Sequence, residues 1–319
     1  MNEKKKTSIG GQAIIEGVMM RGPHKTAMAV RKSDGDILVE VNDNAAAMSN
    51  KILKLPIIRG CINFFTSLAV GMKALMFSAD QIDLEDGEES ESKFDKWLED
   101  KFGDKIKDIV IYVAVALSVI MSVALFIMLP TLLTRGIEWL LAMTPFAAAA
   151  KTKAFTSITE GIIKLIIFIG YLALVSQMKD IKRVYEYHGA EHKTIACYEH
   201  GEELTVENVR KHTRFHPRCG TSFLLFVMIV SIILFAMLPK TGVVLRMIMR
   251  LLLLPVVAGI SYEIIKWAGR SDNKCVALLS KPGLWLQRLT TREPDDSQIE
   301  VAIKSMEAVI PENSEEDKW

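Results

Sequence analysis

The feature that most constrains this chain is an unbroken apolar run of 25 residues, Ile109 to Leu133, which reads IVIYVAVALSVIMSVALFIMLPTLL. A helix rises about 1.5 Å per residue, so this run is longer than the roughly 30 Å of hydrocarbon in a bilayer. A helix that is apolar on every side has no face to turn toward water, which excludes a soluble helical bundle for this segment. The run therefore predicts a membrane-spanning helix.

Three further segments have a similar character, and 50% of the 319 residues are hydrophobic. Residues 155–177 contain two charges, residues 222–238 contain none, and residues 243–267 contain four that lie near the two ends. The sequence therefore predicts a mainly α polytopic membrane protein with about four transmembrane helices. Two of them fall within residues 109–177 and two within residues 222–267.

The charges inside the second and fourth spans recur one helical turn apart. Glu160 precedes Lys164 by four residues, and Arg246 precedes Arg250 by the same spacing. Charges within a membrane mark a functional site by default, but a transport path needs more polar groups along its depth. The pattern favours a structural ion pair between these two spans.

Basic residues are distributed unequally among the loops. Residues 178–221 contain eight lysines and arginines, whereas residues 134–154 contain three. The positive-inside rule places the richer loop in the cytoplasm, and an even number of spans places both termini there too. The balance of 39 basic and 38 acidic residues gives no global case for nucleic-acid binding. Membrane lipids are the expected partners, and the sequence indicates no particular protein partner.

The segments that precede the first span are expected at the cytoplasmic side. Residues 1–53 combine a glycine-rich motif with two β-prone runs on either side of the turn Ser33-Asp34-Gly35-Asp36, which predicts a β-hairpin. Residues 54–80 are apolar but interrupted by charges, which favours an interfacial or re-entrant helix over a fifth span.

Two polar segments flank the spans. Residues 81–108 form an acidic linker followed by an amphipathic stretch. Residues 268–319 form a C-terminal cytoplasmic segment in which Asp295 or Asp296 caps a helix with apolar residues at helical spacing.

Five of the six histidines fall between His188 and His216, within the basic loop at residues 178–221. The string His188-x-x-Glu191-His192 is compatible with a helix, which would place the three side chains on one face. Two imidazoles one turn apart can bind one divalent metal ion. The later string His216-Pro217-Arg218-Cys219 has the two-residue gap that is typical of zinc ligands.

These residues predict a metal site, most simply Zn²⁺, and leave two forms of it open. A closed tetrahedron of His188, His192, His216 and Cys219 is a structural zinc. In an open site one coordination position is left for water, and Glu191 is the catalytic candidate as its general base, in the H-x-x-E-H order of the inverzincins. A cluster without metal, which satisfies interfacial hydrogen bonds or contacts lipid headgroups, is the third interpretation.

Three other residues are additional candidates for the site. Glu263, at the cytoplasmic end of the fourth span, is a more plausible further metal ligand than Glu199, which lies about 16 Å along a straight helix from His188. Glu16 and Arg21 lie in the glycine-rich string GGQAIIEGVMMRGP. Clustered glycines let backbone amides approach an anion, and they equally suit a tight structural turn.

The strings GGQAIIEGVMMRGP, PIIRG, HGAEHKTI, HPRCGTS and PGLWLQRLTTREPDD together resemble the YqhQ family of bacterial membrane proteins. This family has no known function, and a metal-dependent enzymatic activity has been predicted for it. The resemblance covers residues 9–310 and implies a bacterial cytoplasmic membrane. It also implies a metal site built from the residues already singled out, which are Glu16, His188, Glu191, His192, His216 and Cys219. It implies no substrate.

The sequence therefore favours a metal-dependent enzyme, a hydrolase that acts at the cytoplasmic face of the membrane. One alternative is a non-catalytic membrane scaffold or assembly factor with a structural zinc site. A transporter is the second alternative, and the wholly apolar first span argues against it because transporters usually have polar, discontinuous helices near the midplane.

Overall fold

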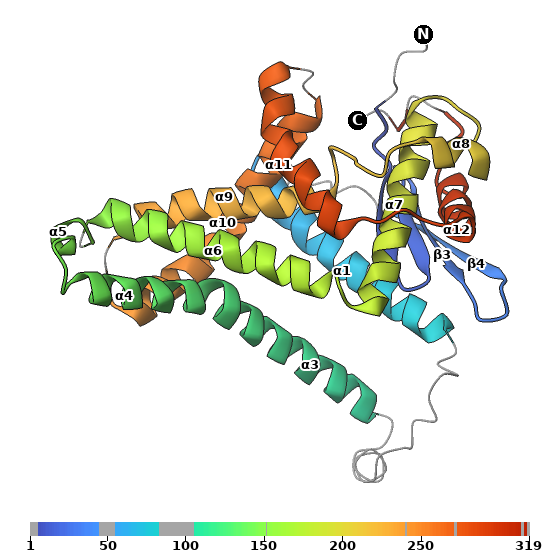
Figure 1. Ribbon diagram of the computed structural model, residues 1–319. Coiled ribbons are helices and arrows are strands. Elements are labelled where there is room, and N and C mark those ends of the chain that lie inside the picture. Colours follow the sequence, from blue (N-terminus) through green and yellow to red (C-terminus); the bar gives the residue numbers. More distant parts are fainter. Residues whose placement is uncertain are drawn as a thin grey trace. The chain divides into compact units, whose positions relative to one another are not determined.

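The computed structural model describes residues 6–44, 55–82, 105–150, 152–239, 241–270, 273–313 and 316–317 (Figure 1). The chain is mainly helical, with one small antiparallel sheet near the N-terminus, which confirms the predicted fold class. It divides into two compact units, each built from separate stretches of the chain. Unit 1 comprises Met1–Asp83, Leu172–Ser231 and Leu253–Trp319, and unit 2 comprises Leu84–Tyr171 and Ile232–Leu252. The predicted acidic linker lies largely outside the described residues.

The sheet of unit 1 has four strands in the order β1-β2-β3-β4 and is wholly antiparallel. The strands are β1 (Gly10–Ile14), β2 (Gly17–Arg21), β3 (Lys25–Arg31) and β4 (Ile37–Asp43). The predicted hairpin is β3-β4, whereas the glycine-rich string forms the two strands that the sequence did not predict. A Cβ on Gly17 would lie 2.3 Å from the Ala29 carbonyl oxygen, so this glycine allows β2 to pair closely with β3.

Side chains alternate between the two faces of the sheet, as the pleat of a strand requires. One face carries Val18, Met20, Ala27 and Ala29, which form a core with α7 (Lys179–Glu199) and α12 (Asp296–Glu307). The opposite face carries Ile14, Met19, Met28 and Val30, which pack with Ala74 of α1 (Ile58–Gln81). The sheet is thereby buried on both faces, and α7 is held against its β1 edge.

Helix α12 begins where the sequence predicted. Asp295 is the N-cap, and its side chain accepts a hydrogen bond from the backbone N–H of Gln298. The Gln298 side chain in turn accepts one from the backbone N–H of Asp295, which completes a capping box. Unit 1 also contains α8 (Val206–Lys211), α11 (Lys274–Thr290) and parts of three helices that it shares with unit 2.

Unit 2 is helical throughout the residues that the structure describes. Its elements are α3 (Lys105–Val123), the π-helical turn η2 (Ala124–Met128), α4 (Leu129–Leu141), α5 (Ala147–Ala150) and parts of α6 (Lys153–Val175), α9 (Gly220–Met237) and α10 (Val243–Arg270). The predicted first span ends at Leu133, but the helix continues to Leu141. Pro130 does not stop it, because the π-helical turn η2, which directly precedes this proline, interrupts the regular i→i−4 hydrogen bonding where the proline lacks an N–H.

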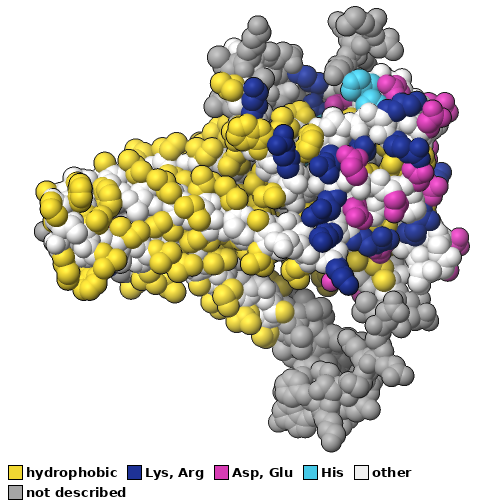
Figure 2. Space-filling view, in the orientation of Figure 1, with side chains coloured by type: hydrophobic (Ala, Val, Ile, Leu, Met, Phe, Trp, Pro, Cys, Tyr) yellow, Lys and Arg dark blue, Asp and Glu magenta, His cyan; other side chains and the backbone are white. Residues whose placement is uncertain are grey.

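Five helices are long and apolar enough to cross a membrane. Four correspond to the predicted spans, and the fifth is α1, which the sequence predicted as interfacial or re-entrant. Figure 2 shows that the surface over the helices of unit 2 is largely hydrophobic, whereas charged side chains gather over α7, α8 and α12. Apolar side chains such as Met121, which is 62% exposed, form the hydrophobic surface. Surfaces of this kind mark sites of contact with a membrane or with another protein.

Candidate metal centre

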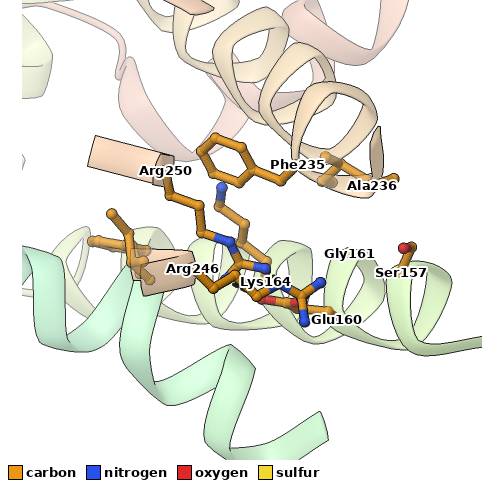
Figure 3. A pocket seen from close by; sticks show the side chains of 11 residues that line it. Ser157, Glu160, Gly161, Lys164, Phe235, Ala236, Arg246 and Arg250 are labelled. Atoms are coloured by element: carbon orange, nitrogen blue, oxygen red, sulfur yellow. Dashed lines mark hydrogen bonds and ion pairs between the residues drawn. The ribbon is translucent and has the colours of Figure 1, made fainter. Parts of the chain in front are cut away.

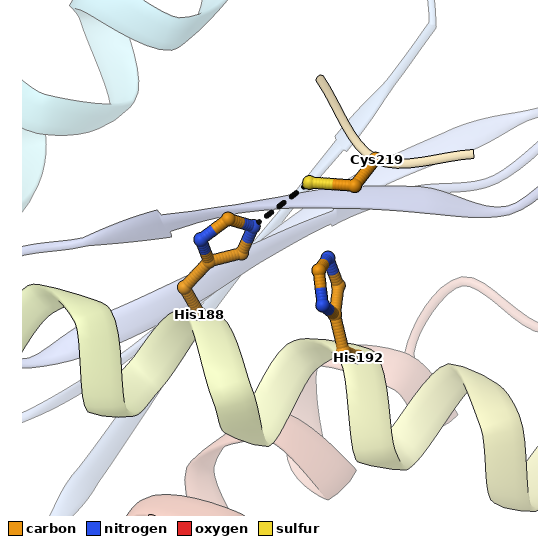
Figure 4. Close-up of side chains that lie close together, drawn as sticks. All are labelled: His188, His192 and Cys219. Carbon is orange, nitrogen blue, oxygen red and sulfur yellow. Dashed lines mark hydrogen bonds between the residues drawn. The ribbon is translucent and has the colours of Figure 1, made fainter. Parts of the chain in front are cut away.

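Helix α7 and the start of α9 bring three potential metal ligands together. His188 and His192 lie one turn apart on α7, and Cys219 immediately precedes α9. One ligand atom from each of the three lies within 4.8 Å of the others (Figure 4). His192 is 1% exposed and Cys219 is 6% exposed, so the group is largely shielded from water. The structure therefore places together three of the four ligands that the sequence proposed.

A hydrogen bond from Nδ1 to a backbone carbonyl oxygen orients each of the two imidazole rings. His188 Nδ1 lies 2.8 Å from the carbonyl oxygen of Thr290, and His192 Nδ1 lies 2.6 Å from that of Arg214. A carbonyl oxygen only accepts, so each Nδ1 carries a proton and each Nε2 is the atom available to a ligand. The His188 Nε2 lies 3.2 Å from Cys219 Sγ. Metal-ligating histidines typically have this outer hydrogen bond, which fixes both ring orientation and tautomer.

The contacts among these side chains also shift the pKa values of Cys219 and His188. Burial disfavours the Cys219 thiolate, but the neighbouring His192 and His188 outweigh burial and hold the pKa of the thiol well below its usual value. Burial likewise disfavours protonated His188, but Cys219 and Glu191 outweigh it and raise the pKa of His188 to about 9. These contacts thus favour a thiolate beside a protonated imidazole. A divalent cation competes with that proton for the same lone pairs, so its binding releases the proton.

Glu191 lies beside the three ligands without being one of them. Its side chain is buried, and Oε2 lies 3.8 Å from His188 Nε2, but the carboxylate is not part of the group within 4.8 Å. Strand β1 packs directly on it, because a Cβ added to Gly11 would lie 2.7 Å from Glu191 Cγ. The second glycine of the N-terminal motif therefore makes room for this carboxylate.

His216 joins a neighbouring network instead of the three-ligand group. Its Nε2 lies 3.7 Å from Glu199 Oε2, and Glu199 also pairs with Arg218. Gln287 holds the backbone of His216 on both sides, accepting from its N–H at 2.8 Å and donating to its carbonyl at 2.7 Å. Burial is the main reason that the pKa of His216 is lowered. These bonds to the backbone of His216 thus help to fix the position of the loop that contains Cys219.

The three additional candidates lie outside the group. Glu16 pairs with Arg183 and accepts a hydrogen bond from the Tyr187 hydroxyl at 3.2 Å, and Glu263 accepts one from Arg59 Nε at 2.7 Å. Arg21 lines a pocket of about 310 Å³ on the face of the sheet that α1 covers. Glu16 and Glu263 are therefore engaged in ion pairs within unit 1.

A second group of potential ligands lies at the other end of α7, and the sequence did not predict it. Atoms of Cys197, Glu202 and His212 lie within 4.8 Å of one another. His212 Nε2 is 3.2 Å from Glu202 Oε2, and burial, followed by the charge of Glu202, raises the pKa of Cys197 to about 11. This cysteine is a neutral thiol at physiological pH. The only signal in the sequence was the presence of a cysteine, a glutamate and a histidine within the same loop.

Comparison with known proteins gives a family but no activity. The family described as "Protein of unknown function (DUF1385)" matches residues 55–312. The chain belongs to this family. It is also 37% identical to "Uncharacterized protein YqhQ" of Bacillus subtilis (strain 168) over 307 residues, which cover 94% of this chain and 92% of that protein. The predicted resemblance is thereby confirmed, whereas neither description mentions a metal or an enzymatic activity. No solved structure matches the chain.

Proposed function

We propose that this DUF1385 protein is a metal-dependent hydrolase at the cytoplasmic face of the bacterial membrane. His188, His192 and Cys219 hold the metal, and Glu191 acts as the general base. One observation carries the proposal: both Nδ1 atoms are bonded to backbone carbonyls, so that the two Nε2 atoms converge with Sγ within 4.8 Å, next to a buried carboxylate. Two imidazoles and a thiolate suit zinc, which is the metal that we propose.

The role of each residue follows from the number of protein ligands that the metal would have. Three protein ligands leave a zinc ion one open position, as in catalytic sites. When bound, the metal supplies Lewis-acid activation of water near neutral pH. The buried Glu191 carboxylate, whose Oε2 lies 3.8 Å from His188 Nε2, would accept the proton of the attacking water and return it to the leaving group. Thr290 and Arg214 hold the two rings in the required tautomer through their carbonyl oxygens.

The location rests on the apolar helices and on the basic loop. Five helices are long and apolar enough to span a membrane, and residues 178–221, which include α7 and Cys219, carry eight lysines and arginines. The positive-inside rule then places the site and both termini in the cytoplasm when four of these helices span. Helix α1 supports that count, since Ala74 in its second half packs on the sheet.

A closed structural zinc is less well supported. It needs a fourth protein ligand, and His216, the candidate from the sequence, lies instead beside Glu199. Among the residues that the structure describes, the group within 4.8 Å contains only His188, His192 and Cys219. An open coordination position is what distinguishes a catalyst from a scaffold.

A cysteine nucleophile is the second candidate, because His188 Nε2 lies 3.2 Å from Cys219 Sγ and Thr290 orients the ring. In that mechanism the thiolate attacks a carbonyl carbon, His188 protonates the leaving group, and water hydrolyses the thioester. His192 then has no direct role. A His192→Ala protein that loses metal but keeps activity would favour this mechanism over the metal-dependent one.

The substitution Glu191→Gln tests the proposal. We expect the variant to keep its zinc and its thermal stability but to lose about 10² to 10⁴ in rate, which is typical of a missing general base. Complementation of a deletion strain gives the functional readout, and elemental analysis of the purified protein gives the metal content. Glu202→Gln, in the second group on the same loop, is the matched control and should complement normally. Normal function of Glu191→Gln would end the hydrolase proposal in this form.

A further inference from the structure

Unit 2 contains a buried polar cluster that the proposed function does not use. Glu160 of α6 accepts a hydrogen bond from Arg250 Nη2 of α10 at 2.8 Å (Figure 3). Arg250 Nη1 also donates to Thr131 Oγ1 of α4 at 2.6 Å. Arg250 is only 2% exposed. This is the ion pair between the second and fourth spans that the sequence predicted, and within it the two charges neutralise each other.

The cluster holds more positive charge than Glu160 can balance. Lys164 and Arg246 line the same pocket as Glu160 and Arg250, and Glu138 is a further carboxylate that acts on Arg246, so the positive charges outnumber the negative ones. Arg246 is 8% exposed, and its Nη2 lies 3.7 Å from the Glu160 oxygen that Arg250 already binds. Its Nε is buried and has no hydrogen-bond partner among the residues that the structure describes. A buried guanidinium with an unsatisfied donor is costly unless an anion completes its contacts.

A pocket of about 380 Å³ lies next to Arg246 and is large enough for such an anion. Thr241 also lines this pocket, and its Oγ1 is a second buried group without a hydrogen-bond partner in the described chain. Arg135 of α4 lines it as well. The carboxylate of Glu138, on the same wall, accepts a hydrogen bond from Thr156. Arg135 of α4, Arg246 of α10 and Thr241, which precedes α10, therefore line one space.

The surroundings of Arg135 indicate which anion fits. Arg135 is exposed on α4 among apolar side chains that are exposed too, including Leu132 at 48% and Trp139 at 63%. The pocket lies close to helix ends, since Arg246 follows the start of α10 at Val243 and Glu138 precedes the end of α4 at Leu141. A phospholipid fits both features, because its phosphate can contact the arginines at the helix ends while its acyl chains contact the apolar surface beside them.

We propose that this pocket binds the phosphate ester of a membrane phospholipid. Arg246 and Arg135 contact the phosphate oxygens, Thr241 donates its hydroxyl hydrogen, and the acyl chains lie against the exposed apolar side of α4. Guanidinium groups suit this role because their planar donors match phosphate oxygens in a bidentate manner. A soluble phosphate ester shares the same recognition chemistry, and the experiment has to separate the two sources.

The test uses full-length protein, stripped of lipid in a neutral detergent and titrated with phosphatidylglycerol while native mass spectrometry counts bound lipid. Parallel titrations use diacylglycerol, which lacks the phosphate, and inorganic phosphate as a competitor. Arg135→Gln and Arg246→Gln are the test variants. Lys153→Gln is the matched control, because Lys153 is a cation at the start of α6 that donates to the Met237 carbonyl at 3.1 Å and does not line the pocket.

We expect one tightly bound phosphatidylglycerol, with affinity about fivefold lower in each arginine variant and unchanged in Lys153→Gln, since a basic residue near phosphate contributes about that factor. Diacylglycerol should not compete. Displacement by inorganic phosphate at equal concentration would support the site but assign it to a soluble phosphate ester. Equal lipid binding by all variants, or equal binding of diacylglycerol, would overturn the proposal. Arg135→Gln keeps the test decisive if Arg246→Gln fails to fold, because Arg135 is exposed.

Discussion

Helix α7 contributes residues to two clusters of potential metal ligands, which differ in their hydrogen bonds and in the pKa of their thiols. His188, His192 and Cys219 form one, and Cys197, Glu202 and His212 form the other, each with ligand atoms within 4.8 Å. In the first cluster backbone carbonyls hold the Nδ1 atoms, and the pKa of the thiol is held low. In the second the thiol pKa is raised to about 11, and the imidazole faces a carboxylate. Proximity alone does not prepare a metal site, because hydrogen bonding and protonation decide which lone pairs are available.

The largest expected difference between the clusters is in zinc affinity. His192→Ala removes a ligand whose ring is already oriented, so we expect the zinc dissociation constant to rise by more than about 100-fold, given that outer-shell changes alone cost 10–100-fold. His212→Ala should leave it unchanged. Competition against a chromophoric chelator measures both values on the purified full-length protein. A similar loss in the two variants would remove the distinction between the clusters.

The second difference is in the pH dependence of thiol alkylation in metal-free protein. The pKa of Cys219 is held well below its usual value by His192 and His188, so its alkylation rate should rise less steeply between pH 6 and 8 than that of Cys197. The pKa of Cys197 is raised to about 11, so its rate should rise about tenfold per pH unit over the same interval.

Single-cysteine proteins and iodoacetamide measure these rates, with labelled peptides quantified by mass spectrometry. The slopes rather than the absolute rates are compared, because both thiols are buried. Equal slopes would show that His188 and His192 do not stabilise the Cys219 thiolate.

A smaller effect concerns the strand that supports the first cluster. In Gly11→Ala the new Cβ would lie 2.7 Å from Glu191 Cγ and 2.8 Å from the Met19 carbonyl oxygen. We expect the free energy of unfolding to fall by about 1–3 kcal/mol, as for other overpacked sites. Gly10→Ala is the matched control, because nothing lies within 4 Å of its added Cβ. Denaturation in detergent compares the two, and equal stability would contradict the close packing of β1 on α7.

The sequence was most informative where structure is determined locally. Hydropathy predicted four of the five apolar helices, and the helical spacing of His188, Glu191 and His192 placed them on one face of α7. The prediction that Asp295 or Asp296 caps α12 is confirmed at Asp295, whose capping box lies within four residues. These features depend on neighbours in the chain, which a single sequence displays directly.

The rest depends on contacts that no local pattern contains. His216 and Cys219 looked equivalent as ligands, and the contact of His216 Nε2 with Glu199, 3.7 Å away, separates them. Strands β1 and β2 were missed because glycines disfavour strands in general. Here Gly11 is required by Glu191 and Gly17 by β3, contacts that only the tertiary structure reveals.

The central claim is that α7 carries one zinc site and that this site contains Cys219 but not Cys197. The most direct measurement is the zinc content per chain, by elemental mass spectrometry, of wild-type, Cys219→Ser and Cys197→Ser proteins purified in parallel without chelator. We predict about one zinc in the wild type and in Cys197→Ser, and almost none in Cys219→Ser, because zinc strongly prefers thiolate to a neutral hydroxyl. Zinc that persists in Cys219→Ser and disappears in Cys197→Ser, or a wild-type protein without zinc, would contradict the claim.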